Sequence, residues 1–133
     1  MKKVTTRGIV FTGEGIGSQY VKIPWVQKQI GEKLGFGPYL GTLNIRLQNK
    51  QEKPEEILRK FEGIEITPVH GFFRARCFTA LIMNKIKGAV VIPEKPNYPS
   101  DVLEIIAPVH LREALSLKDG DEVEIAIFLE TKH

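Results

Sequence analysis

Residues 72–93, FFRARCFTALIMNKIKGAVVIP, contain two candidate β-strands joined by a turn. The segments Phe72–Met83 and Gly88–Pro93 are rich in β-branched and aromatic residues, which favour strands. Between them, Asn84–Gly88 has the asparagine and the glycine that are typical of turns. This stretch therefore predicts that the second half of the chain is largely β-sheet.

The same kinds of pattern predict strands on both sides of this stretch. These strands are Val4–Thr12, Gly41–Leu47, Ile64–Val69, Val102–Ala107 and Glu122–Leu129. Residues 70–71 and 118–121 are expected to form turns, and residues 94–100, with two prolines, are expected to form a loop. Many short strands favour a mainly β fold, a small closed barrel with short peripheral helices. At 133 residues the chain should form one domain over residues 1–133.

Three short helices are expected between the strands. The first begins at Pro24 and ends at Gly35, and its apolar residues four apart form one stripe. The second begins at Pro54, with glutamates in its first turn and basic residues in its last turn, an order that complements the helix dipole. The third, Leu111–Leu117, is one or two turns long. Before the first helix, Tyr20–Ile23 has an extended pattern.

The composition excludes several classes of protein. No apolar stretch approaches the 18 residues of a membrane span, and the N-terminus lacks the apolar segment of a signal peptide. The single cysteine, Cys77, excludes an internal disulfide and suits a reducing cytosol, so we expect a cytoplasmic protein. The net charge of +3 fits a nucleic-acid binder and, equally, an enzyme for anionic nucleotides.

A glycine-rich segment and a nearby strand carry the first functional signal. Gly13–Gly17 (GEGIG) has three glycines, which permit close approach and a nest of N–H groups for an anion. It lacks the spacing of a P-loop or a dinucleotide fingerprint, and a strand rather than a helix is expected after it. On Gly41–Leu47, Thr42 and Asn44 point the same way and present two neutral oxygens. Such oxygens suit Mg²⁺ only when phosphates share the ion, so together these segments predict phosphoryl transfer.

Each of these features also has a simpler interpretation. The glycine segment alone is compatible with a hairpin turn, and the Thr42/Asn44 pair with solvent exposure. Glu104 is the single carboxylate of an apolar strand, where burial would raise its pKa and make it a base or a hydroxyl-orienting group. Arg112 could bind a phosphate or a base edge, or be an exposed helix residue. The three histidines and Cys77 do not have the spacing of zinc ligands.

Five blocks follow one another in a recognisable order. They are residues 12–18 (TGEGIGS), 34–44 (LGFGPYLGTLN), 91–93 (VIP), 103–113 (LEIIAPVHLRE) and 117–121 (LKDGD). This order, over nearly the whole chain, resembles the archaeal CTP-dependent riboflavin kinase family. The resemblance implies a six-stranded cradle-loop (RIFT-type) barrel. It also implies transfer of the γ-phosphate of CTP to the ribityl 5′-hydroxyl of riboflavin, giving FMN and CDP.

The resemblance also implies roles for individual residues. Thr42 and Asn44 would bind Mg²⁺, the implied cofactor. Glu104 would be the catalytic residue and would contact the flavin, and Pro96 would contact the flavin from the loop before it. The implied nucleotide-binding residues are Gly13, Glu14, Gly15, Ile16, Gly17, Ser18, Val109, His110, Leu111 and Arg112. Family members often carry arginine or lysine where this chain has Ser18, and threonine where it has Pro96.

Two other functions stay open. Residues 117–125 also resemble the swapped-hairpin transcription-factor barrels, which bind DNA, and a flavin- or nucleotide-binding protein without catalysis is a further alternative. The C-terminal strand is acidic and no stripe of lysine and arginine is visible, which disfavours DNA binding. We therefore expect a monomer that binds riboflavin, FMN, CTP and CDP, with no nucleic-acid or membrane partner.

Overall fold

The computed structural model describes residues 2–48, 53–69 and 71–129. Seven strands dominate the structure: β1 (Lys2–Phe11), β2 (Leu43–Leu47), β3 (Ile64–Ile66), β4 (Ala75–Ile82), β5 (Ile86–Pro93), β6 (Val102–Ile106) and β7 (Glu122–Leu129). Four helices lie between them: α1 (Ile16–Val21), α2 (Pro24–Leu34), α3 (Pro54–Lys60) and α4 (Leu111–Ala114). The predicted mainly β fold with short helices is confirmed.

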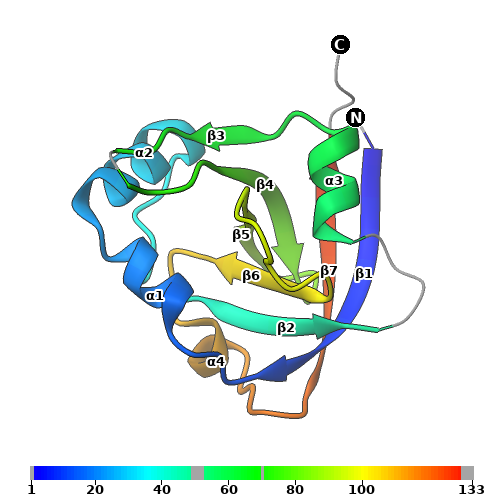
Figure 1. Ribbon diagram of the computed structural model, residues 1–133. Coiled ribbons are helices and arrows are strands. Elements are labelled where there is room, and N and C mark those ends of the chain that lie inside the picture. The colour runs from blue at the N-terminus through cyan, green and yellow to red at the C-terminus, as the bar shows by residue number, and fades with distance from the viewer. Residues whose placement is uncertain (1, 49–52, 70, 130–133) are drawn as a thin grey trace.

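Six of the strands close into an antiparallel barrel (Figure 1). The hydrogen-bonded order is β3-β4-β5-β6-β2-β1-β7, and β7 pairs in addition with β4. Closure is possible because β4 has two partners along one side. Residues 75–77 of β4 pair with β3, whereas residues 80–82 pair with β7. β3 lies outside this closed ring and extends the sheet beside residues 75–77 of β4.

The barrel interior is filled with apolar side chains. In β2, Leu43, Ile45 and Leu47 are buried, whereas Asn44 and Arg46 are turned away from this core, as the alternation predicted. Ile57 of α3, Phe61 directly after α3 and Leu111 of α4 add further buried side chains to the same cluster. Small barrels are packed in this way, so a ligand must bind on the outer face of the barrel or between its loops.

A second apolar cluster lies between the helices and the outer face of the barrel. Val26 and Ile30 of α2 pack there with Cys77, Val91 and Ile106. Cys77 is fully buried in this cluster, and burial raises the pKa of its thiol to about 12. Gly35 ends α2 in the left-handed conformation, as expected for a C-terminal cap.

One predicted segment is wrong. Helix α1 begins at Ile16, within the glycine segment, and continues to Val21, where we expected a strand and an extended Tyr20–Ile23. Gly15 stands before the helix, and Val21 at its end is buried in the outer cluster. This short helix lacks an apolar stripe of its own, and its stability comes from packing against the barrel, which the local pattern does not contain.

Other boundaries differ at the ends of elements. β4 begins at Ala75 rather than Phe72, and β5 begins at Ile86 because the turn lies at Met83 and Asn84, both of which have positive φ. Three strands are shorter in the structure than predicted, namely Gly41–Leu47, Ile64–Val69 and Val102–Ala107. The helix expected over residues 111–117 is also shorter. The turn predicted at residues 70–71 includes residue 70, which lies outside the described residues.

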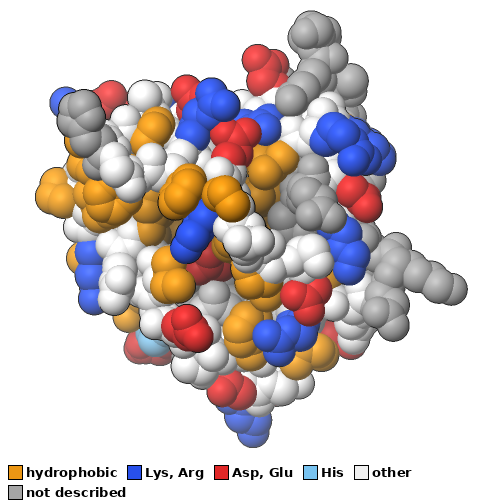
Figure 2. Space-filling model, viewed as in Figure 1, with side chains coloured by type: hydrophobic (Ala, Val, Ile, Leu, Met, Phe, Trp, Pro, Cys, Tyr) orange, Lys and Arg blue, Asp and Glu red, His pale blue; other side chains and the backbone are white. Residues whose placement is uncertain are grey.

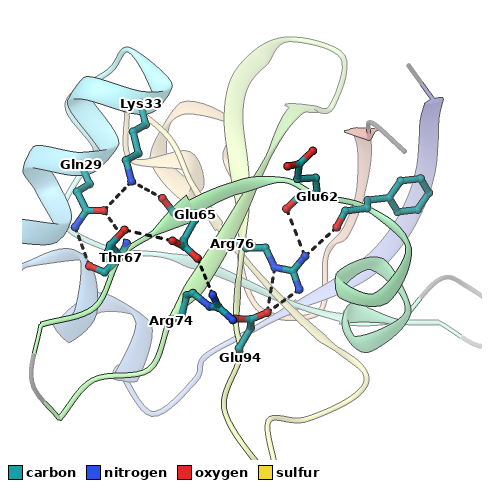
Figure 3. Close-up of polar contacts among 9 residues, drawn as sticks. Gln29, Lys33, Glu62, Glu65, Thr67, Arg74, Arg76 and Glu94 are labelled. Atoms are coloured by element: carbon teal, nitrogen blue, oxygen red, sulfur yellow. Dashed lines mark hydrogen bonds and ion pairs between the residues drawn. The ribbon is translucent and has the colours of Figure 1, made fainter. Parts of the chain in front are cut away.

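A cluster of charged residues connects β3 and β4 to the start of the loop that follows β5 (Figure 3). Glu94, directly after β5, accepts hydrogen bonds from Nε of Arg74 at 2.6 Å and from Nη2 of Arg76 at 2.6 Å. Arg74 also pairs with Glu65 at 3.0 Å, and Nη1 of Arg76 donates to the carbonyl of Phe61 at 2.9 Å. Burial alone would raise the pKa of Glu94, but the hydrogen bonds from the two arginines outweigh it and lower this pKa.

The variant Glu94→Gln is expected to reduce the free energy of unfolding at pH 7 by about 1–3 kcal/mol, because hydrogen bonds to a charged group are lost. The pKa of Glu94 is lower in the folded protein, so this stabilisation is complete above its unfolded pKa and disappears as the pH falls through the folded value. Urea denaturation at pH 7 and at successively lower pH measures the difference between the two proteins, which should shrink with acid.

Glu32→Gln on α2 is the control, because its ion pair with Lys28 spans 3.8 Å between two exposed side chains. Pairs of this kind contribute little to stability. Equal stability changes in the two variants, or a difference for Glu94→Gln that does not depend on pH, would contradict the prediction.

Candidate functional site

Two cavities meet at Thr42, on the outer face of the barrel. The larger has a volume of about 1240 Å³ and lies between the glycine segment, the outward faces of β2 and β6, and the loops at residues 71–73 and 95–99. The smaller has a volume of about 230 Å³ and lies between α1, residues 39–43 and the segment 109–112. Because Thr42 lines both cavities, ligands in them would approach each other at this residue.

A row of side chains crosses the sheet beneath the larger cavity. Asn44 on β2 is paired with Phe11 on β1 and with Glu104 on β6, and Glu104 is paired in turn with Val91 on β5. Residues that are directly opposite in neighbouring strands point the same way and lie about 5 Å apart. The strand register therefore places the amide of Asn44 next to the carboxylate of Glu104.

Both oxygens of the Glu104 carboxylate are engaged. The hydroxyl of Tyr98 donates to Oε2 at 3.0 Å, and the hydroxyl of Thr42 donates to Oε1 at 3.3 Å. Burial raises the pKa of Glu104, and the two hydrogen bonds oppose this increase without cancelling it. Burial, followed by the neighbouring Glu104 carboxylate, likewise raises the pKa of Tyr98.

The glycine segment packs directly on these side chains. A Cβ atom at position 13 would lie 2.9 Å from Nδ2 of Asn44. A Cβ atom at position 17 would overlap Oε1 of Glu104 and would lie 2.8 Å from Oγ1 of Thr42. Real Cβ atoms do not approach other atoms this closely, so the backbone reaches this depth only because these positions are glycine.

The oxygens of Thr42 and Asn44 fit a magnesium ion that is shared with phosphates. Both side chains are half-buried where the glycine segment covers the sheet, and Glu104 lies beside them. Within residues 2–48, 53–69 and 71–129, no three His, Cys, Asp or Glu side chains form a group that could hold a metal ion. Mg²⁺ prefers oxygen ligands and keeps water or phosphate in its remaining positions, which two neutral protein ligands allow.

The smaller cavity contains the other half of the predicted nucleotide-binding residues. Ser18, Val109, His110, Leu111 and Arg112 all line it, whereas Gly13, Glu14, Gly15, Ile16 and Gly17 line the larger one. The rings of Tyr39 and His110 stack in parallel, with centroids 4.5 Å apart and planes inclined by 8°. Both rings line the smaller cavity.

Arg112 is already held by the protein. Its Nη2 donates to Oδ1 of Asp119 at 2.7 Å and to the carbonyl of Phe11 at 3.2 Å. Hydrogen bonds from Arg112 and Thr12 lower the pKa of Asp119. Through Nη2, the guanidinium of Arg112 therefore connects α4 to the end of β1. Its other N–H groups can donate hydrogen bonds to a ligand.

The lining residues that were not predicted from the sequence include Lys22 and Tyr39 in the smaller cavity and Tyr98 in the larger. Lys22 comes one helical turn after Ser18, a relation that becomes visible only once α1 is known to be a helix. Pro96 is exposed and is absent from the cavity wall, although its neighbours at positions 95 and 97–99 line it.

On the face seen in Figure 2, lysine and arginine side chains are interspersed with aspartate and glutamate. The described side chains on this face do not form the continuous basic stripe that DNA binding requires. No helix among the described residues is long and apolar enough to cross a membrane.

Comparison with known proteins connects this site to a family. The model CTP-dep_RFKase, described as "Domain of unknown function DUF120", matches residues 10–127. A riboflavin kinase of Archaeoglobus fulgidus is 42% identical over 130 residues, which cover 95% of this chain and 55% of the relative. A riboflavin kinase of Pyrobaculum aerophilum is 44% identical over 126 residues, 92% of this chain and 60% of the relative.

A riboflavin kinase of Methanococcoides burtonii is 43% identical over 132 residues, 94% of this chain and 57% of the relative. The chain thus spans a little over half the length of these relatives. The match of the family model extends from β1 into β7 and includes both cavities. The chain therefore belongs to the CTP-dep_RFKase (DUF120) family.

Proposed function

We propose that this chain is a CTP-dependent riboflavin kinase, which transfers the γ-phosphate of CTP to the ribityl 5′-hydroxyl of riboflavin. The observation that carries the proposal is the meeting of two cavities at Thr42, beside Glu104 and beneath the glycine segment. Phosphoryl transfer needs two substrates in line at one point. Two cavities that share the lining residue Thr42 would bring their ligands together at that residue.

The shape of each cavity supports its assignment. The smaller cavity, with the flat Tyr39–His110 pair and the basic groups of Lys22 and Arg112, suits the cytidine end of the nucleotide. The larger cavity has room for a three-ring flavin and has aromatic side chains in its wall, including Phe72 and Phe73. The choice of CTP rests on the name of the family model, and the choice of riboflavin rests on the names of the relatives.

Thr42 and Asn44 would hold Mg²⁺, which when bound neutralises charge on the phosphate oxygens. The glycine segment lies close to the same point, and its backbone N–H groups would bind phosphate oxygens there. Glu104 accepts a hydrogen bond from the ribityl 5′-hydroxyl and orients its oxygen for attack on the γ-phosphorus. The new O–P bond forms as the bond to the β-phosphate oxygen breaks, CDP leaves, and the hydroxyl proton passes to Glu104.

Incubation of the chain with riboflavin, Mg²⁺ and one of CTP, ATP, GTP or UTP tests the proposal. FMN formation, separated from riboflavin by chromatography, is expected with CTP and at a much lower rate with the other nucleotides. The absence of FMN with every nucleotide, together with tight binding of riboflavin, would instead favour a flavin-binding protein without catalysis. FMN formation with ATP as fast as with CTP would refute the nucleotide choice alone.

A further inference from the structure

We infer that Tyr98 is a positioning residue that fixes which oxygen of Glu104 is presented to the phosphate acceptor. The inference rests on the proposed kinase function and goes beyond it, because Tyr98 belongs to none of the motifs that indicate that function. Its phenol projects from the loop between β5 and β6 to the carboxylate of Glu104.

The two oxygens of Glu104 have different surroundings. Oε2 accepts the hydrogen bond from Tyr98 at 3.0 Å. Oε1 faces Thr42 at 3.3 Å and lies directly beneath the backbone of Gly17. The last torsion of a glutamate side chain is broad, so packing alone defines the plane of the carboxylate poorly. The phenol of Tyr98 fixes this plane and directs Oε1 toward the junction of the two cavities.

Tyr98 is itself held in place from both ends of its loop. At the start of the loop, the N–H of Glu94 donates to the carbonyl of Arg74 at 2.7 Å, and the Glu94 carboxylate is bound by Arg74 and Arg76 (Figure 3). Within the loop, the N–H of Tyr98 donates to the carbonyl of Lys95 at 3.3 Å. At its end the chain enters β6, the strand that carries Glu104. An orienting group is effective only when its own geometry is preset in this way.

The chain also contains a control outside both cavities. The hydroxyl of Thr67 donates to Oε2 of Glu65 at 3.4 Å, and neither residue lines a cavity. Thr67→Val and Tyr98→Phe thus each remove a hydroxyl that donates to a carboxylate, but only Tyr98→Phe removes a hydrogen bond to Glu104.

The test compares steady-state kinetics of Tyr98→Phe, Thr67→Val, Glu104→Ala and the double variant Tyr98→Phe/Glu104→Ala. In Tyr98→Phe we expect kcat to fall about 10- to 100-fold, the scale of a misplaced catalytic group, while KM for CTP stays within about twofold. Thr67→Val should keep the wild-type kcat. Because Tyr98 acts through Glu104, the double variant should have the same kcat as Glu104→Ala.

A wild-type kcat in Tyr98→Phe would overturn the inference, and so would a double variant whose loss is the product of the two single losses. Both results leave the proposed function intact, since they require an active wild-type chain. Absence of FMN formation by the wild-type chain would overturn the proposed function and this inference together.

Discussion

Replacement of Asn44 by alanine is expected to reduce kcat for FMN formation by about 10²–10³-fold, which corresponds to about 3–4 kcal/mol of lost transition-state stabilisation. The side chain of Asn44 projects from the outer face of β2, paired with Glu104, at the point covered by Gly13. Its loss would remove one of two protein ligands for the ion that shields the transferring phosphate. The measurement is kcat at saturating substrates over a range of Mg²⁺ concentrations.

The fold should tolerate the same change. Asn44 is turned away from the barrel interior, where Leu43 and Ile45 on either side are fully buried. Asn44→Ala should therefore change the free energy of unfolding by about 1 kcal/mol or less, because the half-buried side chain lies outside the barrel core. Thr79→Ala, at an exposed position of β4 distant from both cavities, serves as a control for activity and stability. Turnover by Asn44→Ala at the wild-type rate under limiting Mg²⁺ would eliminate the metal assignment.

The pattern of β2 shows how much of the site the sequence contains. Strict alternation of Leu43, Asn44, Ile45, Arg46 and Leu47 correctly predicted which side chains enter the barrel and which remain outside. Alternation is a local property, so it can be read from one strand. It also indicated that Thr42 and Asn44 would share a face, and the structure places both in the wall of the larger cavity.

Adjacency between strands is not a local property. Asn44 meets Glu104 because β2 pairs with β6 in one particular register, and the barrel closes because Ala80 pairs with Ile127. Either register could shift by two residues without changing the hydrophobic pattern of the strands. The order of the five blocks indicated a shared site through the resemblance to a family. The residues alone did not, because the Thr42/Asn44 pair was equally compatible with solvent exposure.

Tyr98 and Lys22 were missed for two different physical reasons. Tyr98 lies in a loop whose path is set by Glu94 and its arginines, and contacts of this kind have no periodic signature. Lys22 enters the smaller cavity because residues 16–21 are helical, and a helix of six residues is stabilised chiefly by its tertiary contacts. A search for basic residues within five positions of the glycine segment would have found Lys22.

Gly17→Ala is expected to have an effect on kcat as large as that of Asn44→Ala, about 10²-fold or more, through a different cause. Gly17 lies within α1 and does not have positive φ, so alanine is compatible with its backbone. The added methyl group, however, would overlap Oε1 of Glu104 and crowd Oγ1 of Thr42. Either the carboxylate rotates away from Tyr98 and Thr42, or the glycine segment lifts from the sheet, and both changes separate groups that must act together.

Gly31→Ala in α2 is the matched control, because this helical glycine does not have positive φ and an added methyl group there would meet no described atom within 4 Å. It should keep wild-type kinetics and raise the free energy of unfolding by about 0.5–1 kcal/mol, since alanine is the better helix former. Gly17→Ala should gain no stability and lose activity, measured by urea denaturation and FMN formation. Equal kinetics for the two variants would show that the close approach of the glycine segment to Glu104 has no part in the reaction, because a methyl group that overlaps Oε1 of Glu104 would then be harmless.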